Sequence, residues 1–215
     1  MYVAVPTHFA HNCFMRKTKL PTSTHDTQEQ IMNAAWERFV QYGFVKTTMA
    51  EIARDCGMSA ANLYRFFKSK QDIGAALAGR CMAEKELHLQ AVVDQQGISS
   101  AERLHVFALT IFDYMYTQCL GTPRINELIE SVCMERSEMV IQHMQAMQML
   151  ISRILVSGKH NKEFAVKNVA ATAAAIQAAL IIFTIPHAVH LYTRKEFEAL
   201  AHDVIDLVVR GIAKR

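Results

Sequence analysis

The sequence lacks the patterns that mark several large classes of protein. Its five cysteines are odd in number and widely spaced, and no Cys-x-x-Cys pair occurs. This argues against a disulfide framework and a zinc knuckle, and favours reduced thiols. No Gly-x-Ser-x-Gly elbow, His-Glu-x-x-His spacing, phosphate-binding loop or glycine-rich dinucleotide turn is present. We therefore expect no enzyme activity, no cofactor and no bound metal.

We expect neither a signal peptide nor a membrane span in this sequence. The first charged residues, Arg16 and Lys17, follow the mildly apolar start instead of preceding it. Residues 168–193 carry no formal charge, but their first half is mostly alanine, and alanine contributes little to membrane insertion. We expect a helix buried in protein, and a cytoplasmic, nucleoid-associated location. Met15 opens a more typical start, so residues 1–14 are either a loose tail or foreign to the native protein.

The charge that is present is unevenly distributed. The chain is 51% hydrophobic and 20% charged, which is typical of a globular protein. Residues 16–70 hold nine basic and five acidic side chains, whereas the remainder holds 14 and 15. This imbalance suits a polyanion partner at one end of the protein, and ordinary fluctuation would produce it equally well.

Helix signals dominate the chain. A Ser or Thr followed three residues later by an acid or amide, the spacing of a capping box, recurs before apolar periodic stretches. These pairs are Thr27/Gln30, Thr48/Glu51, Ser69/Asp72, Ser99/Glu102 and Thr193/Glu196. With the periodicity, they predict helices over residues 28–42, 48–55, 59–66, 70–94, 100–119, one or two within 123–157, 165–185 and 194–213.

The predicted fold class is all-α. A small N-terminal helical bundle over residues 27–72 precedes a larger helical body over residues 73–215, and residues 1–26 form a disordered or basic arm. No internal repeat or low-complexity linker separates the two parts, so we expect them to share the long fourth helix.

Residues 47–70 have the layout of a helix-turn-helix. Thr48 caps a short helix, Gly57 ends it where a left-handed residue is needed, and Ser59 caps a second short helix. The buried faces are predicted to carry Met49, Ile52, Ala53, Leu63, Phe66 and Phe67.

The outward face of the second short helix carries groups that suit DNA. Asn62 can pair with adenine and Arg65 with guanine or phosphate, while threonine, tyrosine and lysine side chains suit phosphates. Asn62 could instead face solvent, Tyr64 could be half-buried packing, and the threonines could serve only as caps. The predicted DNA-facing set is Thr47, Thr48, Ser59, Ala60, Ala61, Asn62, Tyr64, Arg65 and Lys70.

Residues 28–72 resemble the TetR/AcrR family of bacterial transcriptional regulators. The positions that carry the resemblance are Ile31, Ala34, Ala35, Phe39, Gly43, Phe44, Thr47, Thr48, Met49, Ile52, Ala53, Gly57, Met58, Ser59, Leu63, Tyr64, Phe67, Ser69 and Lys70. The resemblance implies a homodimer that reads a palindromic operator, with residues 59–65 as recognition helix and Lys70 on the backbone. Arg16, Lys17 and Lys19 are either an arm that reaches DNA or a solvated tail.

The helical body is predicted to bind a small molecule. A largely apolar pocket with a few polar groups would suit a hydrophobic effector. The candidate lining residues are Phe107, Ile111, Tyr114, Met115, Met139, His143, Met144 and Gln177. Met139, His143 and Met147 share one helix face, which would suit Cu(I), although methionines at helical spacing usually fill a core.

The last two predicted helices carry apolar faces suited to a shared core or to a two-fold interface. The face of the first of these helices carries Ala170, Ala173, Ala174, Gln177, Ala178 and Ile181. The face of the second carries Leu200, Val204, Leu207, Val208 and Ile212. The resemblance favours a homodimer through these helices. The predicted function is a ligand-responsive repressor of transcription, and the alternative is a ligand-independent nucleoid-associated or nucleoid-occlusion protein of the same fold.

Overall fold

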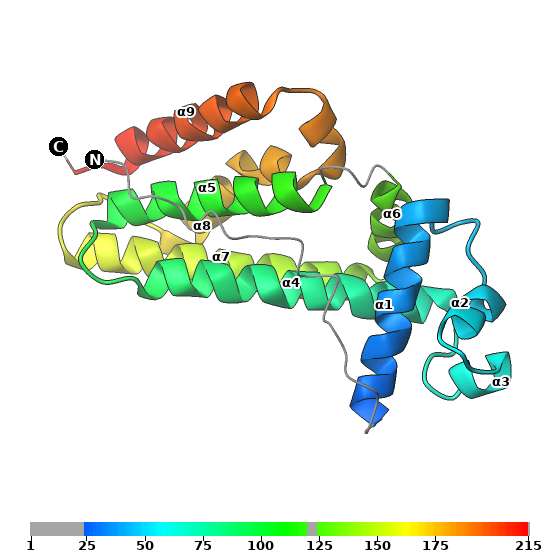
Figure 1. Ribbon diagram of the computed structural model, residues 1–215. Coiled ribbons are helices and arrows are strands. Elements are labelled where there is room, and N and C mark those ends of the chain that lie inside the picture. Colours follow the sequence, from blue (N-terminus) through cyan, green and yellow to red (C-terminus); the bar gives the residue numbers. More distant parts are fainter. Residues whose placement is uncertain (1–23, 120–123, 215) are drawn as a thin grey trace. The chain divides into compact units, whose positions relative to one another are not determined.

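The computed structural model describes residues 24–119 and 124–214, in which the regular elements are helices joined by loops (Figure 1). The predicted basic arm at Arg16, Lys17 and Lys19 lies outside the described residues. The helices are α1 (Thr24–Tyr42), α2 (Met49–Asp55), α3 (Ala60–Leu63), α4 (Lys70–Asp94), α5 (Ser100–Cys119), α6 (Ile125–Glu135), α7 (Ser137–His160), α8 (Val169–Ala179) and α9 (Arg194–Ile212), with 3-10 helices η1 (Ile181–Thr184) and η2 (Pro186–His190) between the last two. The all-α prediction is confirmed.

Four of the five predicted capping pairs sit at helix starts. Thr48 and Thr193 form complete capping boxes with Glu51 and Glu196. Ser69 and Ser99 each accept a hydrogen bond, of 3.1 Å, from the amide three residues later. The fifth prediction is wrong, because α1 already begins at Thr24 and Thr27 lies inside it.

The predicted helix over residues 165–185 is also wrong in its extent. The α-helix ends at Ala179, and the chain continues as η1 and η2. Ile185 has an extended backbone, with φ −97° and ψ 116°, directly before Pro186. A residue before proline is pushed out of the helical region by the proline ring, which explains the break between the two 3-10 helices.

The described residues form two compact units. The first unit comprises residues 24–84 and 124–140, and the second comprises residues 85–119 and 141–214. Helices α4 and α7 therefore each run from one unit into the other. This division differs from the predicted boundary after residue 72, because α6 belongs to the first unit: Leu128 and Val132 are buried in its core.

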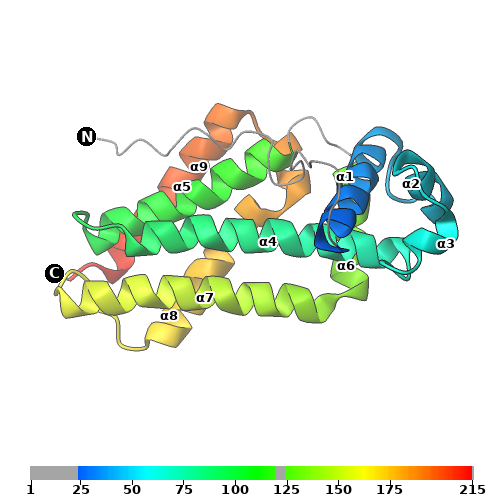
Figure 2. The same ribbon diagram turned by 60° about the horizontal axis from the view of Figure 1, so that its bottom comes forward.

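The core of the first unit joins α1 to α4 with α6. Its fully buried side chains include Ile31, Phe39, Ile52, Leu63 and Leu77. The Phe39 and Phe44 rings meet edge to face with centroids 5.0 Å apart, a favourable aromatic geometry. Helices α1, α2 and α3 lie together in this unit (Figure 2).

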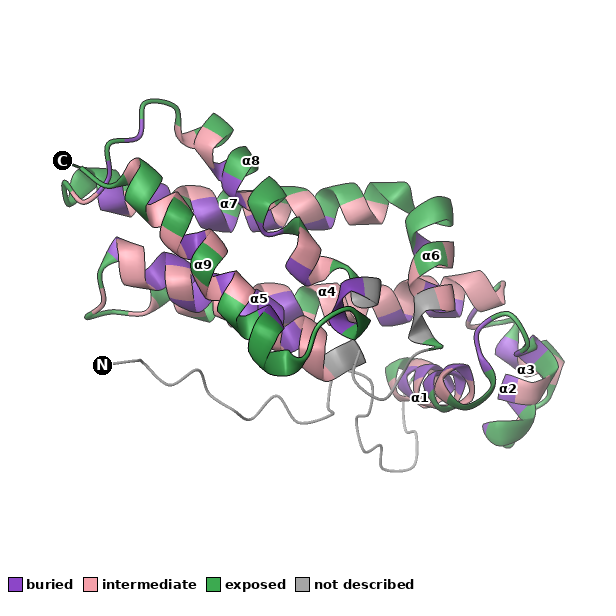
Figure 3. Cartoon of the chain, turned by 90° about the horizontal axis from the view of Figure 1, so that it is seen from above, coloured by how far each residue is buried: buried purple, intermediate pink, exposed green. Residues whose placement is uncertain are grey.

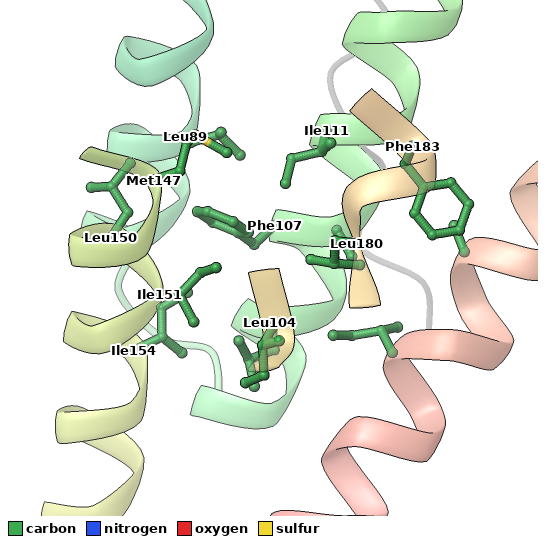
Figure 4. Packing of buried hydrophobic residues seen from close by; sticks show 14 of the residues in the cluster. Leu89, Leu104, Phe107, Ile111, Met147, Leu150, Ile151, Ile154, Leu180 and Phe183 are labelled. Carbon is green, nitrogen blue, oxygen red and sulfur yellow. The ribbon is translucent and has the colours of Figure 1, made fainter. Parts of the chain in front are cut away.

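The core of the second unit is formed by the remaining helices. Phe107 of α5 lies among Leu89, Ile111, Met147 and Leu180, whose side chains point toward one another (Figure 4). Helix α9 runs alongside α5 (Figure 1). Among the described residues no strand occurs, only an isolated antiparallel bridge between Phe164 and Ala213. None of the described helices has the length and apolar character that crossing a bilayer requires.

Candidate nucleic-acid interface

Helices α2 and α3 pack around a tight turn whose geometry matches a helix-turn-helix. Gly57 adopts φ +66°, the left-handed conformation that a residue with a Cβ rarely takes. Ser59 then accepts a hydrogen bond of 3.2 Å from the Asn62 amide and caps α3. Met49, Ile52 and Leu63 are buried, so the predicted inward faces are correct for these residues.

The outer surface of α3 and of the turn after it is exposed. Ser59, Ala61 and Arg65 are exposed, and Tyr64 is 52% exposed. Asn62 is half-buried, and Ala60 is half-buried against the core of the first unit. The α-helix itself ends at Leu63, and backbone bonds from Arg65 and Phe66 continue it as tight turns. Because α3 begins with small residues and is followed by Tyr64 and Arg65, its outer surface can approach a DNA groove closely.

Thr47 has a different environment from the one predicted. The residue is 2% exposed, and its hydroxyl donates a 2.8 Å hydrogen bond to the Gly43 carbonyl. The residue therefore closes the loop between α1 and α2 from inside and does not offer its hydroxyl to a phosphate in this structure. Thr48 is exposed, but its hydroxyl is engaged with Glu51 in the capping box.

Lys70 is also engaged within the protein. Its Nζ donates to the carbonyls of Phe44, at 2.6 Å, and Val45, at 3.0 Å, and lies 4.7 Å from the centre of the Phe44 ring. Burial lowers the pKa of this amine, and the nearby Glu127 and Glu51 carboxylates oppose that shift. Lys70 thus ties the start of α4 to the loop between α1 and α2, a role that its position in the motif did not indicate.

Three exposed cations near this surface were not predicted as site residues. Lys46 precedes Thr47, Lys68 lies between Phe67 and Ser69, and Arg54 lies in the last turn of α2. All three contribute to the basic surplus of residues 16–70, which was the available signal. The motif spacing gave no reason to single them out, because these positions are outside the family pattern.

Arg38 joins α1 to α2 beside the helix-turn-helix. Its guanidinium forms ion pairs with Asp55 and, at 3.4 Å, with Glu51. The hydrogen bond to Asp55 raises the pKa of Arg38 further above its ordinary range. Nearby, burial raises the pKa of the Cys56 thiol to about 11, so this cysteine at the end of α2 stays protonated and unreactive at neutral pH.

The predicted effector-binding residues fall into two groups. Phe107, Ile111 and Tyr114 are buried in the second unit, where Met115, Met144 and Gln177 are half-buried. The Gln177 side-chain amide donates to the Met144 carbonyl at 2.8 Å and so joins α8 to α7. Met139 belongs to the first unit, where it packs against the core.

His143 is the most deeply buried polar candidate of the second unit. The side chain is 8% exposed, and its Nδ1 lies 2.5 Å from a Glu86 carboxylate oxygen. Burial and the neighbouring Lys85 lower the pKa of His143, against the opposing effect of Glu86. The contact with Glu86 engages Nδ1 of His143, one of the two ring nitrogens that could bind a metal. No group of three or more potential His, Cys, Asp or Glu ligands occurs in the described part of the chain.

Two family models match the chain, one over its N-terminal part and one over its C-terminal part. Residues 31–77 match the model described as bacterial regulatory proteins, tetR family. Residues 100–205 match the tetracyclin repressor-like C-terminal domain. The chain belongs to the TetR family.

Curated relatives of this TetR-family chain match over part of their length. It is 25% identical over 119 residues to the transcriptional regulator TtgR of Pseudomonas putida, a stretch covering 55% of each protein. It is 35% identical over 78 residues to the transcriptional repressor BepR of Brucella suis, covering 36% of each. The chain thus spans about half the length of the first of these relatives. By name, one relative is a transcriptional regulator and the other a transcriptional repressor.

Solved structures of the family share the fold. A structure of SmeT with triclosan superimposes with a TM-score of 0.62 at 17% identity, covering 87% of this chain and 92% of that one. SmeT is the repressor of a multidrug efflux pump of Stenotrophomonas maltophilia. At this level of identity the likeness concerns the fold.

Proposed function

We propose that this TetR-family protein is a ligand-responsive transcriptional repressor that binds a palindromic DNA operator as a homodimer. The observation that carries the proposal is the capped helix-turn-helix, whose outer surface presents Tyr64 and Arg65 and which the exposed cations Lys46 and Lys68 flank in the sequence. Arg65 suits a guanine edge or a phosphate, and the lysines suit phosphates. Ser59, Ala61 and Asn62 complete the surface that enters the major groove, with Ala60 packed behind it.

The effector is proposed to be a small, mostly hydrophobic molecule bound in the second unit. The support is chemical: the interior of this unit is aromatic and aliphatic, and His143 and Gln177 add polar groups to it. Triclosan, the ligand of SmeT, is an example of the ligand class. The relatives named above are regulators, which favours this function over a ligand-independent nucleoid-occlusion role.

The homodimer is proposed to form through the last two helices, mainly through α8. Ala170, Ala174 and Ala178 are exposed on that helix, and Ile181 after it is 41% exposed. Figure 3 shows that α8 carries exposed positions. Small uncharged residues permit two helices to approach closely across a two-fold axis. On α9, Leu207 is 69% exposed, whereas Leu200, Val204, Val208 and Ile212 pack against the core of their own unit.

The test is selection of DNA fragments by the purified protein at moderate salt, followed by a binding titration. We expect a palindromic sequence to be enriched, and Arg65→Ala to weaken its binding by about 1–3 kcal/mol with reduced discrimination between bases. A screen of hydrophobic compounds, triclosan among them, would then measure release of the selected fragment.

Two outcomes would contradict the proposal. If no fragment is enriched over random DNA, only nonspecific phosphate binding remains and the repressor function is wrong. If both Asn62→Ala and Arg65→Ala bind the selected fragment as tightly as the wild type, the assigned recognition surface is wrong.

A further inference from the structure

The loop between α1 and α2 is held by side chains from outside it. The Val45 amide donates a 3.0 Å hydrogen bond to a Glu127 carboxylate oxygen, while the Val45 carbonyl accepts one from Lys70. Both backbone polar groups of Val45 are therefore paired with charged side chains, although Val45 as a whole residue is 72% exposed. Hydrogen bonds to charged groups are stronger than neutral ones, so this loop tip has a fixed position.

Glu127 fits this loop closely because Gly43 has no side chain. A Cβ on Gly43 would lie 3.0 Å from the same Glu127 oxygen that accepts from Val45, closer than an ordinary contact. Gly43 also adopts φ +94°, which is strained for other residues. The carboxylate of Glu127 thus occupies the space beside Gly43, and its charge also acts favourably on Lys70 across the loop.

Helix α6, which carries Glu127, is fixed to the rest of the first unit at several points. Arg124 donates to the Gln41 carbonyl at the end of α1, and Arg136 forms an ion pair with Asp72 in the first turn of α4. Leu128 packs so close to α4 that a Cβ on Gly74 would come within 2.6 Å of its Cδ1. The position of the Glu127 carboxylate is therefore determined by α6 as a whole.

The loop leads directly to the proposed DNA-binding surface. Lys46, the residue after Val45, is exposed, and Thr48, two residues after Lys46, caps α2. We propose that Glu127 is a positioning residue for DNA binding: by holding the Val45 amide it sets where Lys46 and the start of α2 meet the DNA. The proposal rests on the repressor function argued above and assigns a residue of α6 to it, although Glu127 itself does not touch DNA.

The sign of the effect separates positioning from simple electrostatics. DNA repels a carboxylate near its binding surface, so removal of the charge alone would strengthen binding. Loss of a positioning hydrogen bond would weaken it. We expect Glu127→Ala to bind the selected palindromic fragment about tenfold more weakly than the wild type, the size of effect typical of a lost charge-assisted hydrogen bond.

The conservative variant and a control in the same unit sharpen the test. Glu127→Gln keeps an oxygen that accepts from Val45, so we expect its binding to stay within about threefold of the wild type. Glu138→Ala removes the same charge from an exposed position in the first turn of α7, and we expect it to bind no more weakly than the wild type. All three are compared by fluorescence anisotropy with the same DNA fragment, at a temperature where thermal unfolding curves show each to be folded.

Hydrogen exchange of the Val45 amide provides a readout that does not depend on DNA. The exchange rate is expected to rise in Glu127→Ala, and to change little in Glu127→Gln and Glu138→Ala. The proposal is overturned if Glu127→Ala binds the fragment as tightly as, or more tightly than, the wild type, or if Glu127→Gln loses as much affinity as Glu127→Ala. If the wild type itself selects no fragment, the repressor function fails, and the amide exchange still reports on the loop contact.

Discussion

At the scale of single residues, two neighbouring lysines show how the surroundings of a side chain decide its role. Lys68 is exposed beside the helix-turn-helix, whereas Lys70 has its amine on the carbonyls of Phe44 and Val45. A free ammonium can neutralise a phosphate and release a counterion, but an ammonium already bonded to two carbonyls stabilises the fold. The two residues therefore have different predicted effects although they carry the same charge.

Methionine substitution at each lysine tests this difference. Lys68→Met is expected to weaken binding to all DNA sequences similarly and to reduce the slope of log affinity against log salt by about 0.9. Lys70→Met is expected to lower the free energy of unfolding by about 1–2 kcal/mol, because it leaves the two loop carbonyls unpaired. Binding titrations at several salt concentrations and urea unfolding measure both. Equal unfolding free energies for the two variants would contradict the assignment.

On the scale of secondary-structure elements, the turn between α2 and α3 depends on one backbone conformation. Gly57 has φ +66°, and a Cβ there would meet nothing within 4 Å. A loss of stability on replacing Gly57 would therefore come from its backbone conformation and not from crowding of the new side chain. Gly211, within α9, also has no atom within 4 Å of the Cβ position, and its φ is not in the left-handed range.

Alanine at these two glycines should have opposite effects. Gly57→Ala is expected to destabilise the protein by about 1–2 kcal/mol, the cost of a left-handed conformation with a Cβ. Gly211→Ala is expected to stabilise it by about 0.5–1 kcal/mol, because alanine loses less backbone entropy in a helix. Chemical denaturation gives both values. If Gly57→Ala leaves the free energy of unfolding unchanged, the turn can adopt another conformation.

On the scale of the whole molecule, His143 links stability to pH. Its pKa is lowered in the folded protein from an ordinary value of 6.5, first by burial and then by Lys85. The unfolded chain therefore binds a proton at this site more readily than the folded one. The contribution of His143 to the free energy of unfolding is complete above pH 6.5 and is lost as the pH falls below it.

Unfolding measured between neutral and mildly acidic pH tests this linkage. The wild type is expected to lose stability over this range, and His143→Gln to lose less of it, because the glutamine does not titrate. The comparison is best kept above roughly pH 5, where few carboxyl groups change their protonation. If the free energy of unfolding falls equally with pH in the wild type and in His143→Gln, the pKa of His143 is not lowered.

The proposed dimer is a second property of the whole molecule. Ala174→Glu places a charge on the exposed face of α8, where a two-fold axis would bring two such charges together. We expect this variant to be a monomer in analytical ultracentrifugation and to bind the palindromic fragment more weakly. Gln96→Glu adds the same charge at an exposed position between α4 and α5 and is expected to remain dimeric. A dimeric Ala174→Glu protein would exclude this face as the interface.

The sequence by itself determined the class of fold, most helix boundaries and the helix-turn-helix. Periodicity and capping residues act within a few residues of the chain, so Thr48, Gly57 and Ser59 reveal their roles locally. The predicted start of α1 and the single helix over residues 165–185 were wrong, because capping spacings also occur by chance and a proline restricts the residue before it.

The tertiary structure decided which of the motif's polar groups are available. Thr47 and Lys70 match the family pattern, yet the hydroxyl of one and the amine of the other bond to carbonyls of the loop between α1 and α2. The Lys70 contact joins residues 26 positions apart, and Glu127 reaches Val45 across 82. A hydrogen-bond partner that lies so far away in the chain leaves no periodic or short-range signal, so only the folded structure distinguishes a residue that holds the loop from one that faces DNA.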